Sequence, residues 1–259
     1  MSRYRAALIH LLISVALISV VIGIIFWFWY PRPSFEAVGA ISIVRLLVVV
    51  HLVIGPLLTL IVFKHGKPGL KFDLYAIALM QVVALVYGSW RLYDEKPHYL
   101  VFAIDRLEFV SKKQVDQSAI GYDELREKRF GGLIQAFARP PVDPEEYQRY
   151  FDSVVFEGQP DLESRAEFFE PWAAGANDIR SQLKPIEDIR PASPREQENL
   201  RQAIDYYAEG HPSLGILPIG GIEKDLGMLL DRDTLEILGI LNADPWLVNE
   251  TKVSPDASK

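Results

Sequence analysis

The sequence predicts a membrane protein of two parts: an α-helical anchor with three transmembrane helices, followed by a soluble α+β domain with a small antiparallel sheet. Three observations predict this division. Three long apolar segments fall within the first 91 residues, the net charge changes sign near that point, and short strand and helix patterns follow. We expect the anchor to span residues 1–91, the soluble domain residues 92–248, and a disordered tail residues 249–259.

The charge of the chain separates the two parts. Up to Arg91 the chain has eight Lys and Arg against two acids, a charge of +6, and from Leu92 onward the charge is −13. So acidic a soluble part lacks the clustered positive face that nucleic acid binding requires, so no nucleic acid partner is expected. The sequence contains no cysteine, which excludes disulfides, thiolate metal sites and thiol catalysis.

The first apolar segment, at about residues 6–29, is predicted to be a transmembrane helix. It contains no Asp, Glu, Lys or Arg, and about 20 apolar residues suffice to cross the hydrocarbon core of a bilayer. The aromatic run at residues 26–30 is typical of a headgroup interface, and Pro31 and Pro33 are expected to end the helix.

A cleaved signal peptide is the alternative for this segment. Arg3 and Arg5 precede the apolar run, and Val38-Gly39-Ala40 resembles a cleavage site. The run is longer than the roughly 7–15 apolar residues of a signal peptide, so we favour an uncleaved helix.

The second and third transmembrane helices are predicted at about residues 41–63 and 72–90. Each segment alone resembles an apolar core helix of a soluble protein, but three such runs so close together favour membrane spans. Arg45 lies near the start of the second segment, where its side chain can reach the headgroups. His51 and Gln81 lie near the bilayer midplane, and we expect a hydrogen bond between them.

The loops predict the orientation of the anchor. Arg3 and Arg5 precede the first helix, and Lys64, Lys67 and Lys71 lie between the second and third helices. Cytoplasmic loops are enriched in Lys and Arg, which places the N-terminus and the 64–71 loop in the cytoplasm. The soluble domain is then exported, to the periplasm if this is the inner membrane of a Gram-negative cell.

Gly55 and Pro56 form a predicted notch in the second helix. Proline removes one backbone hydrogen bond, and glycine permits close approach of another backbone. The notch is therefore a candidate place for helix docking.

The soluble domain shows alternating strand and helix patterns. Strands are expected where β-branched and aromatic residues cluster, and helices where apolar residues recur at helical spacing after a capping residue. The expected strands are 99–105 extended through 107–110, 132–138, 214–219, 226–230 and 235–241, with a hairpin turn at 231–234. The expected helices are 143–155, 193–208 and part of 162–183.

No catalytic, cofactor-binding or metal-binding site is predicted, and no small-molecule substrate is evident. Ser181 and Lys184 match one spacing of penicillin-recognising enzymes, but the partner motifs are absent. Residues 217–221 partly match a sortase signal without its threonine. The five histidines have no ligand spacing, and no phosphate-binding or dinucleotide-binding loop occurs. The sequence therefore predicts a protein that is not an enzyme.

The chain resembles the TfpX/TfpZ family of type IV pilin accessory proteins. The resemblance spans most of the chain and is thinnest at residues 112–213. His51 stands where the family leads us to expect an acidic residue. The residues that carry the resemblance are Ile9-His10-Leu-Leu-Ile, Leu52-Val-Ile-Gly55-Pro56-Leu-Leu-Thr59-Leu, Leu70-Lys71-Phe72-Asp73-Leu74, Gln81, Val101-Phe-Ala-Ile-Asp105-Arg106 and Asp244-Pro245-Trp246.

The resemblance implies an inner-membrane, chaperone-like protein that stabilises or helps assemble a cognate type IV pilin, the major pilin of the same strain. A pilin waits in the membrane as one apolar helix with a globular head, and its helix carries a glutamate near the cytoplasmic end. Arg45 lies at the wrong depth for this glutamate, whereas Lys64 or Thr59 is better placed. The alternative is a membrane-anchored periplasmic sensor without catalytic activity. The hypothetical partner-binding residues are Gly55, Pro56, Thr59, Lys64, His51 and Gln81.

Overall fold

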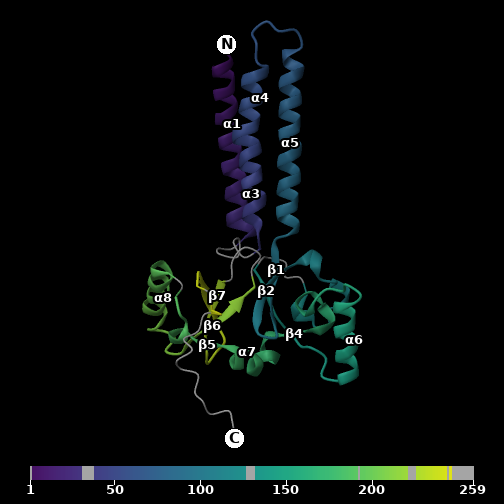
Figure 1. The fold of residues 1–259 in the computed structure, drawn as a ribbon, viewed down its shortest axis with the longest axis vertical. Coiled ribbons are helices and arrows are strands. Elements are labelled where there is room, and N and C mark those ends of the chain that lie inside the picture. The colour runs from purple at the N-terminus through teal and green to yellow at the C-terminus, as the bar shows by residue number, and fades with distance from the viewer. Residues whose placement is uncertain are drawn as a thin grey trace. The chain divides into compact units, whose positions relative to one another are not determined.

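A computed structural model describes residues 2–30, 38–126, 132–191, 193–220, 226–243 and 245–246. The chain divides into two compact units, Met1–Lys96 and Pro97–Lys259. The first contains three helices long and apolar enough to cross a membrane, and the second contains a mixed sheet with helices (Figure 1). The predicted fold class is confirmed. The tail expected to be disordered lies outside the described residues.

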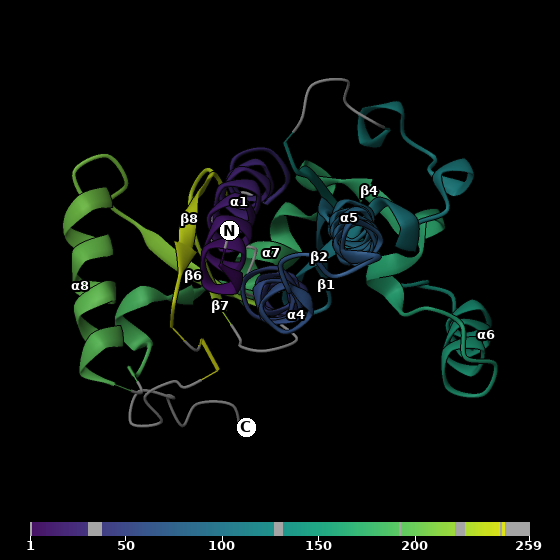
Figure 2. The same ribbon diagram turned by 90° about the horizontal axis from the view of Figure 1, so that it is seen from above.

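All three predicted transmembrane segments are helical in the first unit, where they run side by side (Figures 1 and 2). The third helix is longer at both ends than predicted. Within the first and second helices, one turn each has π-helical rather than α-helical hydrogen bonding. The elements are α1 (Arg3–Ile24), η1 (Ile25–Trp29), α3 (Ala40–Val49), η2 (Val50–Ile54), α4 (Gly55–Val62) and α5 (Leu70–Asp94).

The π-helical turn η2 lies immediately before Pro56. Proline has no backbone N–H, so the helix cannot keep its regular hydrogen bonds at this point. The Gly55 N–H donates to the Val50 carbonyl, a π-helical spacing. One ring nitrogen of His51, Nδ1, lies 2.8 Å from the Leu47 carbonyl oxygen. These bonds keep the widened turn satisfied where lipid supplies no water.

Aromatic residues tie the end of the first helix to the end of the third. The Tyr30 hydroxyl donates to the Leu92 carbonyl at 2.8 Å, and both residues are fully buried. The Trp29 and Tyr93 rings meet edge to face with centroids 5.3 Å apart. The predicted interfacial aromatics therefore also pack the helices together. The two prolines expected to stop the first helix lie outside the described residues.

An ion pair holds the turn that precedes α5. Lys67 Nζ lies 2.6 Å from an oxygen of Asp73. Asp73 lies in the first turn of α5, where its charge also favours the positive end of the helix dipole. Gly69 caps this helix with a φ of 80°, a left-handed conformation that glycine adopts without strain.

The second unit is built on an eight-stranded sheet of order β4-β3-β1-β2-β6-β7-β8, with β5 paired to β6. β1 runs parallel to β3 and β2 parallel to β6, whereas the other pairs are antiparallel. The sheet is therefore mixed and larger than the small antiparallel sheet we expected. The strands are β1 (Pro97–Ala103), β2 (Arg106–Ser111), β3 (Ile134–Ala138), β4 (Phe169–Pro171), β5 (Lys184–Pro185), β6 (Leu214–Ile219), β7 (Leu226–Asp231) and β8 (Ile237–Leu241).

Local capping explains where the longer helices of this unit begin. The Asp143 side chain accepts hydrogen bonds from two backbone N–H groups at the start of α6, and Ser193 accepts one at the start of α8. The stretch 162–183 is partly helical as predicted, but it also contains β4, which was not predicted. The α-helices are α6 (Pro144–Val155), α7 (Ala176–Gln182) and α8 (Pro194–Tyr207). The 3-10 turns are η3 (Lys112–Gln114), η4 (Gln117–Ala119), η5 (Asp123–Leu125), η6 (Leu162–Ser164), η7 (Ala166–Phe168), η8 (Trp172–Gly175) and η9 (Ile186–Asp188).

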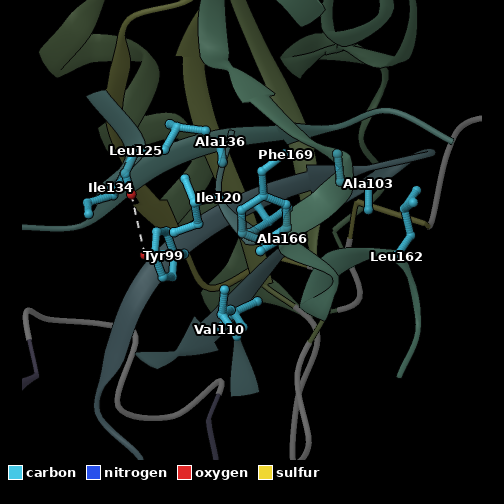
Figure 3. Packing of buried hydrophobic residues seen from close by; sticks show 13 residues of the cluster. Tyr99, Ala103, Val110, Ile120, Leu125, Ile134, Ala136, Leu162, Ala166 and Phe169 are labelled. Carbon is cyan, nitrogen blue, oxygen red and sulfur yellow. Dashed lines mark hydrogen bonds between the residues drawn. The ribbon is translucent and has the colours of Figure 1, made fainter. Parts of the chain in front are cut away.

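A buried cluster packs around β1 and β3 (Figure 3). Tyr99 is fully buried, and its ring meets Phe169 edge to face at 5.7 Å. The Tyr99 hydroxyl lies 3.0 Å from the Gln117 side-chain oxygen and 3.3 Å from the Leu125 carbonyl, so its polar end is bonded inside the core. One residue thus joins the sheet to the turns that cover it.

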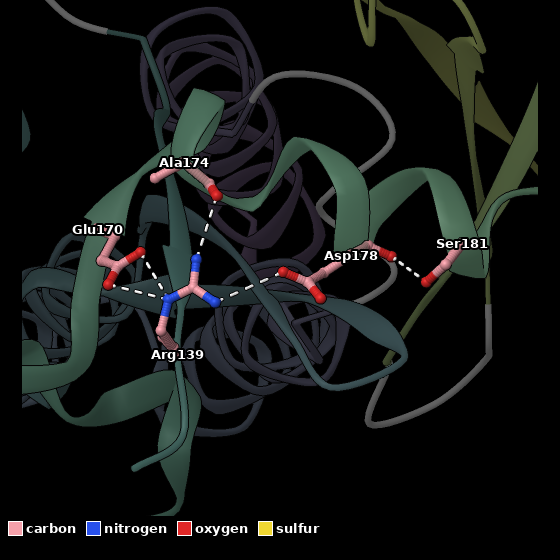
Figure 4. Close-up of polar contacts among 5 residues, drawn as sticks. All are labelled: Arg139, Glu170, Ala174, Asp178 and Ser181. Atoms are coloured by element: carbon pink, nitrogen blue, oxygen red, sulfur yellow. Dashed lines mark hydrogen bonds and ion pairs between the residues drawn. The ribbon is translucent and has the colours of Figure 1, made fainter. Parts of the chain in front are cut away.

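Arg139 fastens the edge strand β4 and the segment that follows it to the end of β3 (Figure 4). Its Nε lies 3.0 and 2.9 Å from the two carboxylate oxygens of Glu170. Its terminal nitrogens reach the Ala174 carbonyl at 3.1 Å and the Asp178 carboxylate at 3.6 Å. The guanidinium also lies over the Phe137 ring, 4.7 Å from its centroid. A very short edge strand is held in this way by side-chain bonds in addition to its ladder.

Asp231 organises the predicted turn between β7 and β8. One carboxylate oxygen accepts the N–H groups of Asp233 and Thr234 at 2.9 and 2.8 Å, and the other lies 2.9 Å from His211 Nδ1. The Asp231 side chain is only 6% exposed. The Thr234 N–H bond, helped by His211 and the Asp233 N–H, lowers the pKa of this carboxyl from 3.8 to about 2. The turn is thus stabilised by the charged form.

We expect Asp231→Asn to lower the free energy of unfolding by about 2 kcal/mol at pH 7, because the amide keeps an acceptor oxygen but loses the charge. An Asp in an unfolded chain has a pKa of about 3.9, so the stabilising charge is present above about pH 4. It is lost as the pH falls toward 2, where the folded state also becomes protonated. Denaturant unfolding of the full chain in detergent, followed by circular dichroism at several pH values, measures the difference.

Asp233→Asn is the matched control, since this side chain is exposed in the same turn. It is expected to change stability by less than about 0.5 kcal/mol. A deficit for Asp231→Asn that stays constant down to pH 2 would contradict the assignment.

Candidate functional site

Polar side chains from all three membrane helices meet inside the first unit. His51 and Thr59 on the second helix are buried, and Gln81 lies on α5. Sequence analysis singled out these three residues as candidates. The structure adds His10 from α1, which lies between Thr59 and Gln81. We call His10, Thr59 and Gln81 the polar triad.

The polar triad forms one chain of hydrogen bonds. His10 Nε2 lies 2.5 Å from the Gln81 side-chain oxygen, which can only accept, so the ring donates there. His10 Nδ1 lies 2.6 Å from the Thr59 hydroxyl, which then donates to it. Gln81 Nε2 donates to the Val50 carbonyl at 3.4 Å. Every one of these bonds is compatible with a neutral imidazole, the form that lipid surroundings favour.

The bond expected between His51 and Gln81 exists, but it uses the backbone of Gln81. His51 Nε2 lies 3.1 Å from the Gln81 carbonyl oxygen, and the Gln81 side chain turns to His10 instead. His51 is 1% exposed and is held on its other nitrogen by Leu47. It therefore links the second helix to α5 in the interior of the unit.

Gly55 lies against Gln81 of the same chain, which corrects the expectation of an open notch. Gly55 is buried, and a Cβ atom added there would overlap the Gln81 side-chain amide. The close approach that glycine permits is thus used to pack α4 on α5. Pro56 acts through the π-helical turn before it. Partner binding at these residues stays a prediction.

The two cations considered for partner binding lie on the outside of the first unit. Arg45 is exposed, as expected for a side chain that reaches the headgroups. Lys64 is also exposed and follows directly after α4. The Thr59 hydroxyl, in contrast, is buried and bonded to His10.

A groove of about 350 Å³ lies between α1 and α5, with the second helix as its floor. α1 and α5 both pack on α4, and Figure 2 shows them on either side of it. Exposed apolar side chains form the rims: Ile9 and Ile13 on α1, and Ala78 and Val82 on α5. The polar triad and His51 line the floor. We call this the α1/α5 groove. Its volume is within the range of small-molecule binding pockets, about 300–1,000 Å³.

His10 is the residue that sequence analysis missed as a site residue. It was visible as the one ionisable side chain of an otherwise uncharged segment, and an ionisable group inside a membrane is a default functional candidate. Its partners could not be identified, because Thr59 and Gln81 lie 49 and 71 positions away in the sequence.

The described parts of the chain hold no group of three His, Asp or Glu side chains that could bind a metal ion. The Ser181 hydroxyl, part of the serine-lysine spacing, donates to the Asp178 carbonyl at 2.6 Å (Figure 4). The Lys184 amine donates to the Pro245 carbonyl at 2.9 Å and lies over the Trp246 ring. Both side chains thus have structural contacts.

Comparison with known proteins places the chain among fimbrial proteins. The family profile "Fimbrial assembly protein FimB" matches residues 1–39, which include the whole of α1. A fimbrial assembly protein of serogroups C1 and C2 from Dichelobacter nodosus is 32% identical over 110 residues, 41% of this chain and 83% of that relative. The chain belongs to the fimbrial assembly protein family. The predicted kinship with a pilus-related family is confirmed at this level, and TfpX/TfpZ membership stays a prediction.

Two longer relatives in the fimbrial assembly family extend the match beyond the anchor. The proteins of serogroups I and E1 from the same organism are each 26% identical over 202 residues, 76% of this chain and 77% of the relative. No solved structure matches the chain significantly.

We expect His10→Leu and Gln81→Leu to be energetically coupled in this fimbrial assembly family member. Each change alone leaves the other side chain without its partner inside the anchor, so a double-mutant cycle should give a coupling of about 1 kcal/mol. Unfolding free energies of the full chain in detergent provide the four corners of the cycle.

Ser19→Leu combined with Gln81→Leu is the matched cycle, because Ser19 is an exposed polar residue of α1 outside the polar triad. Its coupling is expected to be near zero. Equal coupling in both cycles would show that the His10–Gln81 bond does not stabilise the anchor.

Proposed function

We propose that this chain is a non-catalytic accessory protein of fimbrial assembly, which stabilises a cognate type IV pilin by holding its transmembrane helix in the α1/α5 groove. Membership of the fimbrial assembly family supports the process. The single observation that carries the mechanism is the groove, whose exposed apolar rims are not covered by a fourth helix of the described chain.

The chemistry of the groove suits a helix. Helices associate in lipid mainly through close packing, since lipid tails are as apolar as the side chains. Ala6 and Ala78, small residues on opposite walls, leave room for a neighbouring backbone. The polar triad is already bonded internally, so it presents a satisfied floor rather than a site that demands a charged ligand.

One cation remains as a candidate partner for the pilin glutamate that the family resemblance implies. Thr59 is committed to His10, whereas Lys64 is exposed at the end of the second helix. An ammonium beyond the helix end can stay hydrated while it attracts a carboxylate near the same membrane face. We therefore assign this role to Lys64 and not to Thr59.

The proposal places the chain in the inner membrane with the N-terminus in the cytoplasm and the second unit in the periplasm. Positive charge at the N-terminus and in the 64–71 loop supports this orientation. The pilin helix and its head would then each face a part of this chain.

We expect Ala78→Phe to lower the cellular level of the pilin several-fold, because the ring fills the groove and an unheld subunit is degraded. Immunoblots of pilin and counts of surface pili measure the effect in a deletion strain complemented with the variant. Complementation with the unaltered gene should restore both quantities.

Leu79→Phe is the matched control. Leu79 adjoins Ala78 on α5 but lies outside the groove and is exposed. It should support normal pilin levels at equal amounts of the accessory protein. Normal pilin in the Ala78→Phe strain would refute the groove as the binding place, and normal pili in the deletion strain would refute the function.

A further inference from the structure

Helix α6 is an amphipathic helix of the second unit with its apolar face only partly covered. No residue of α6 is buried. Tyr147, Phe151 and Val155 follow one another at four-residue spacing and therefore lie on one side of the helix. They are 47%, 45% and 53% exposed. We call these three side chains the α6 face.

The orientation of α6 is fixed by contacts at Tyr150 and Ser153. The Tyr150 hydroxyl lies 2.5 Å from the Asp161 carboxylate, and its ring meets Phe168 edge to face at 5.5 Å. The Arg165 guanidinium donates to the Ser153 hydroxyl at 2.9 Å. Burial and the Asp161 bond raise the pKa of Tyr150, so this hydroxyl stays protonated at neutral pH. The α6 face is thus presented on a fixed helix at the margin of the unit (Figure 1).

Helix α8 shows how the same unit treats an amphipathic helix that has a partner. Its Leu200 and Ala203 are buried in a cluster with residues of β6 and β7. α6 has a comparable apolar periodicity but leaves its aromatic side chains half exposed. Amphipathic helices dock into apolar grooves through anchors at this spacing. The α6 face therefore has the form of an unoccupied docking surface.

The charges around the α6 face select the kind of partner. Residues 144–157 contain four acids, Glu145, Glu146, Asp152 and Glu157, against one basic residue, Arg149. Helices that lie on anionic membranes carry Lys and Arg on their polar side, so this charge disfavours a lipid surface. It favours a protein groove that is apolar inside and edged with Lys or Arg.

We propose that the α6 face docks into a basic-rimmed apolar groove on the extramembrane part of the same pilin. This inference rests on the proposed function and adds a second contact to it, outside the membrane. Two contacts joined through one chain raise the effective concentration of each, so neither needs to be strong alone.

The test places a photoreactive phenylalanine analogue at position 151 of the full chain, in cells that make the pilin. Ultraviolet light should yield an adduct recognised by pilin antibody, expressed as a fraction of total pilin. The same analogue at position 206 is the control, because Tyr206 is 78% exposed on α8 and lies outside the docking surface. An adduct at 151 and none at 206 is the expected result.

Two further variants, each combined with the analogue at 151, test the chemistry of the contact. Tyr147→Ala removes a neighbouring anchor and should lower the adduct about tenfold, as loss of a central aromatic contact does. Glu145→Lys with Asp152→Lys should lower it further through repulsion of the basic rim. Each variant must accumulate like the unaltered chain.

Equal adducts at 151 and 206, adducts at 151 only with lipid or a second copy, or insensitivity to the charge reversal would overturn the inference. Its failure is distinguishable from failure of the proposed function. If Ala78→Phe lowers pilin while position 151 gives no pilin adduct, the membrane groove stands and the α6 contact falls. If the adduct forms and Ala78→Phe has no effect, the reverse holds.

Discussion

A polar group inside a bilayer must find its partner within the protein, because the lipid offers none. The arrangement of the anchor follows from this constraint. His10, Thr59 and Gln81 come from three different helices and satisfy one another. Apolar packing alone leaves helices free to rotate or slide, whereas these bonds require specific rotations of all three. The groove exists in its present form because the bonds fix the walls on either side of it.

The π-helical turn before Pro56 belongs to the same arrangement. Proline prevents regular helical bonding, and the extra residue in the turn offsets the faces of the second helix before and after it. His51 lies within the turn and reaches both Leu47 and the backbone of Gln81. A feature that would destabilise a soluble helix thus supplies a contact between helices. The second unit uses related devices in water, where Arg139 and Asp231 satisfy the backbone of an edge strand and a tight turn.

The sequence was sufficient for features that depend on local pattern. The three membrane helices, most strands of the sheet and the caps at Asp143 and Ser193 follow from length, periodicity and residue type. The parallel pairings of β1 with β3 and of β2 with β6 did not, since they join strands whose proximity no local pattern encodes. His51, Thr59 and Gln81 were found as polar residues in lipid, but their partners depend on how helices rotate against one another. Gly55 correctly indicated a close approach, and the structure shows that the approaching helix is the chain's own.

Gly55 and Gln81 form a single steric unit, because the amide occupies the space that any side chain at position 55 would need. In relatives with the same helix packing, a larger residue at the first position is therefore compatible only with a shorter one at the second. The two positions should change together during evolution, and His10 should change with them when the amide is lost. Covariation among these positions would thus record the packing of the anchor in sequences for which no structure exists.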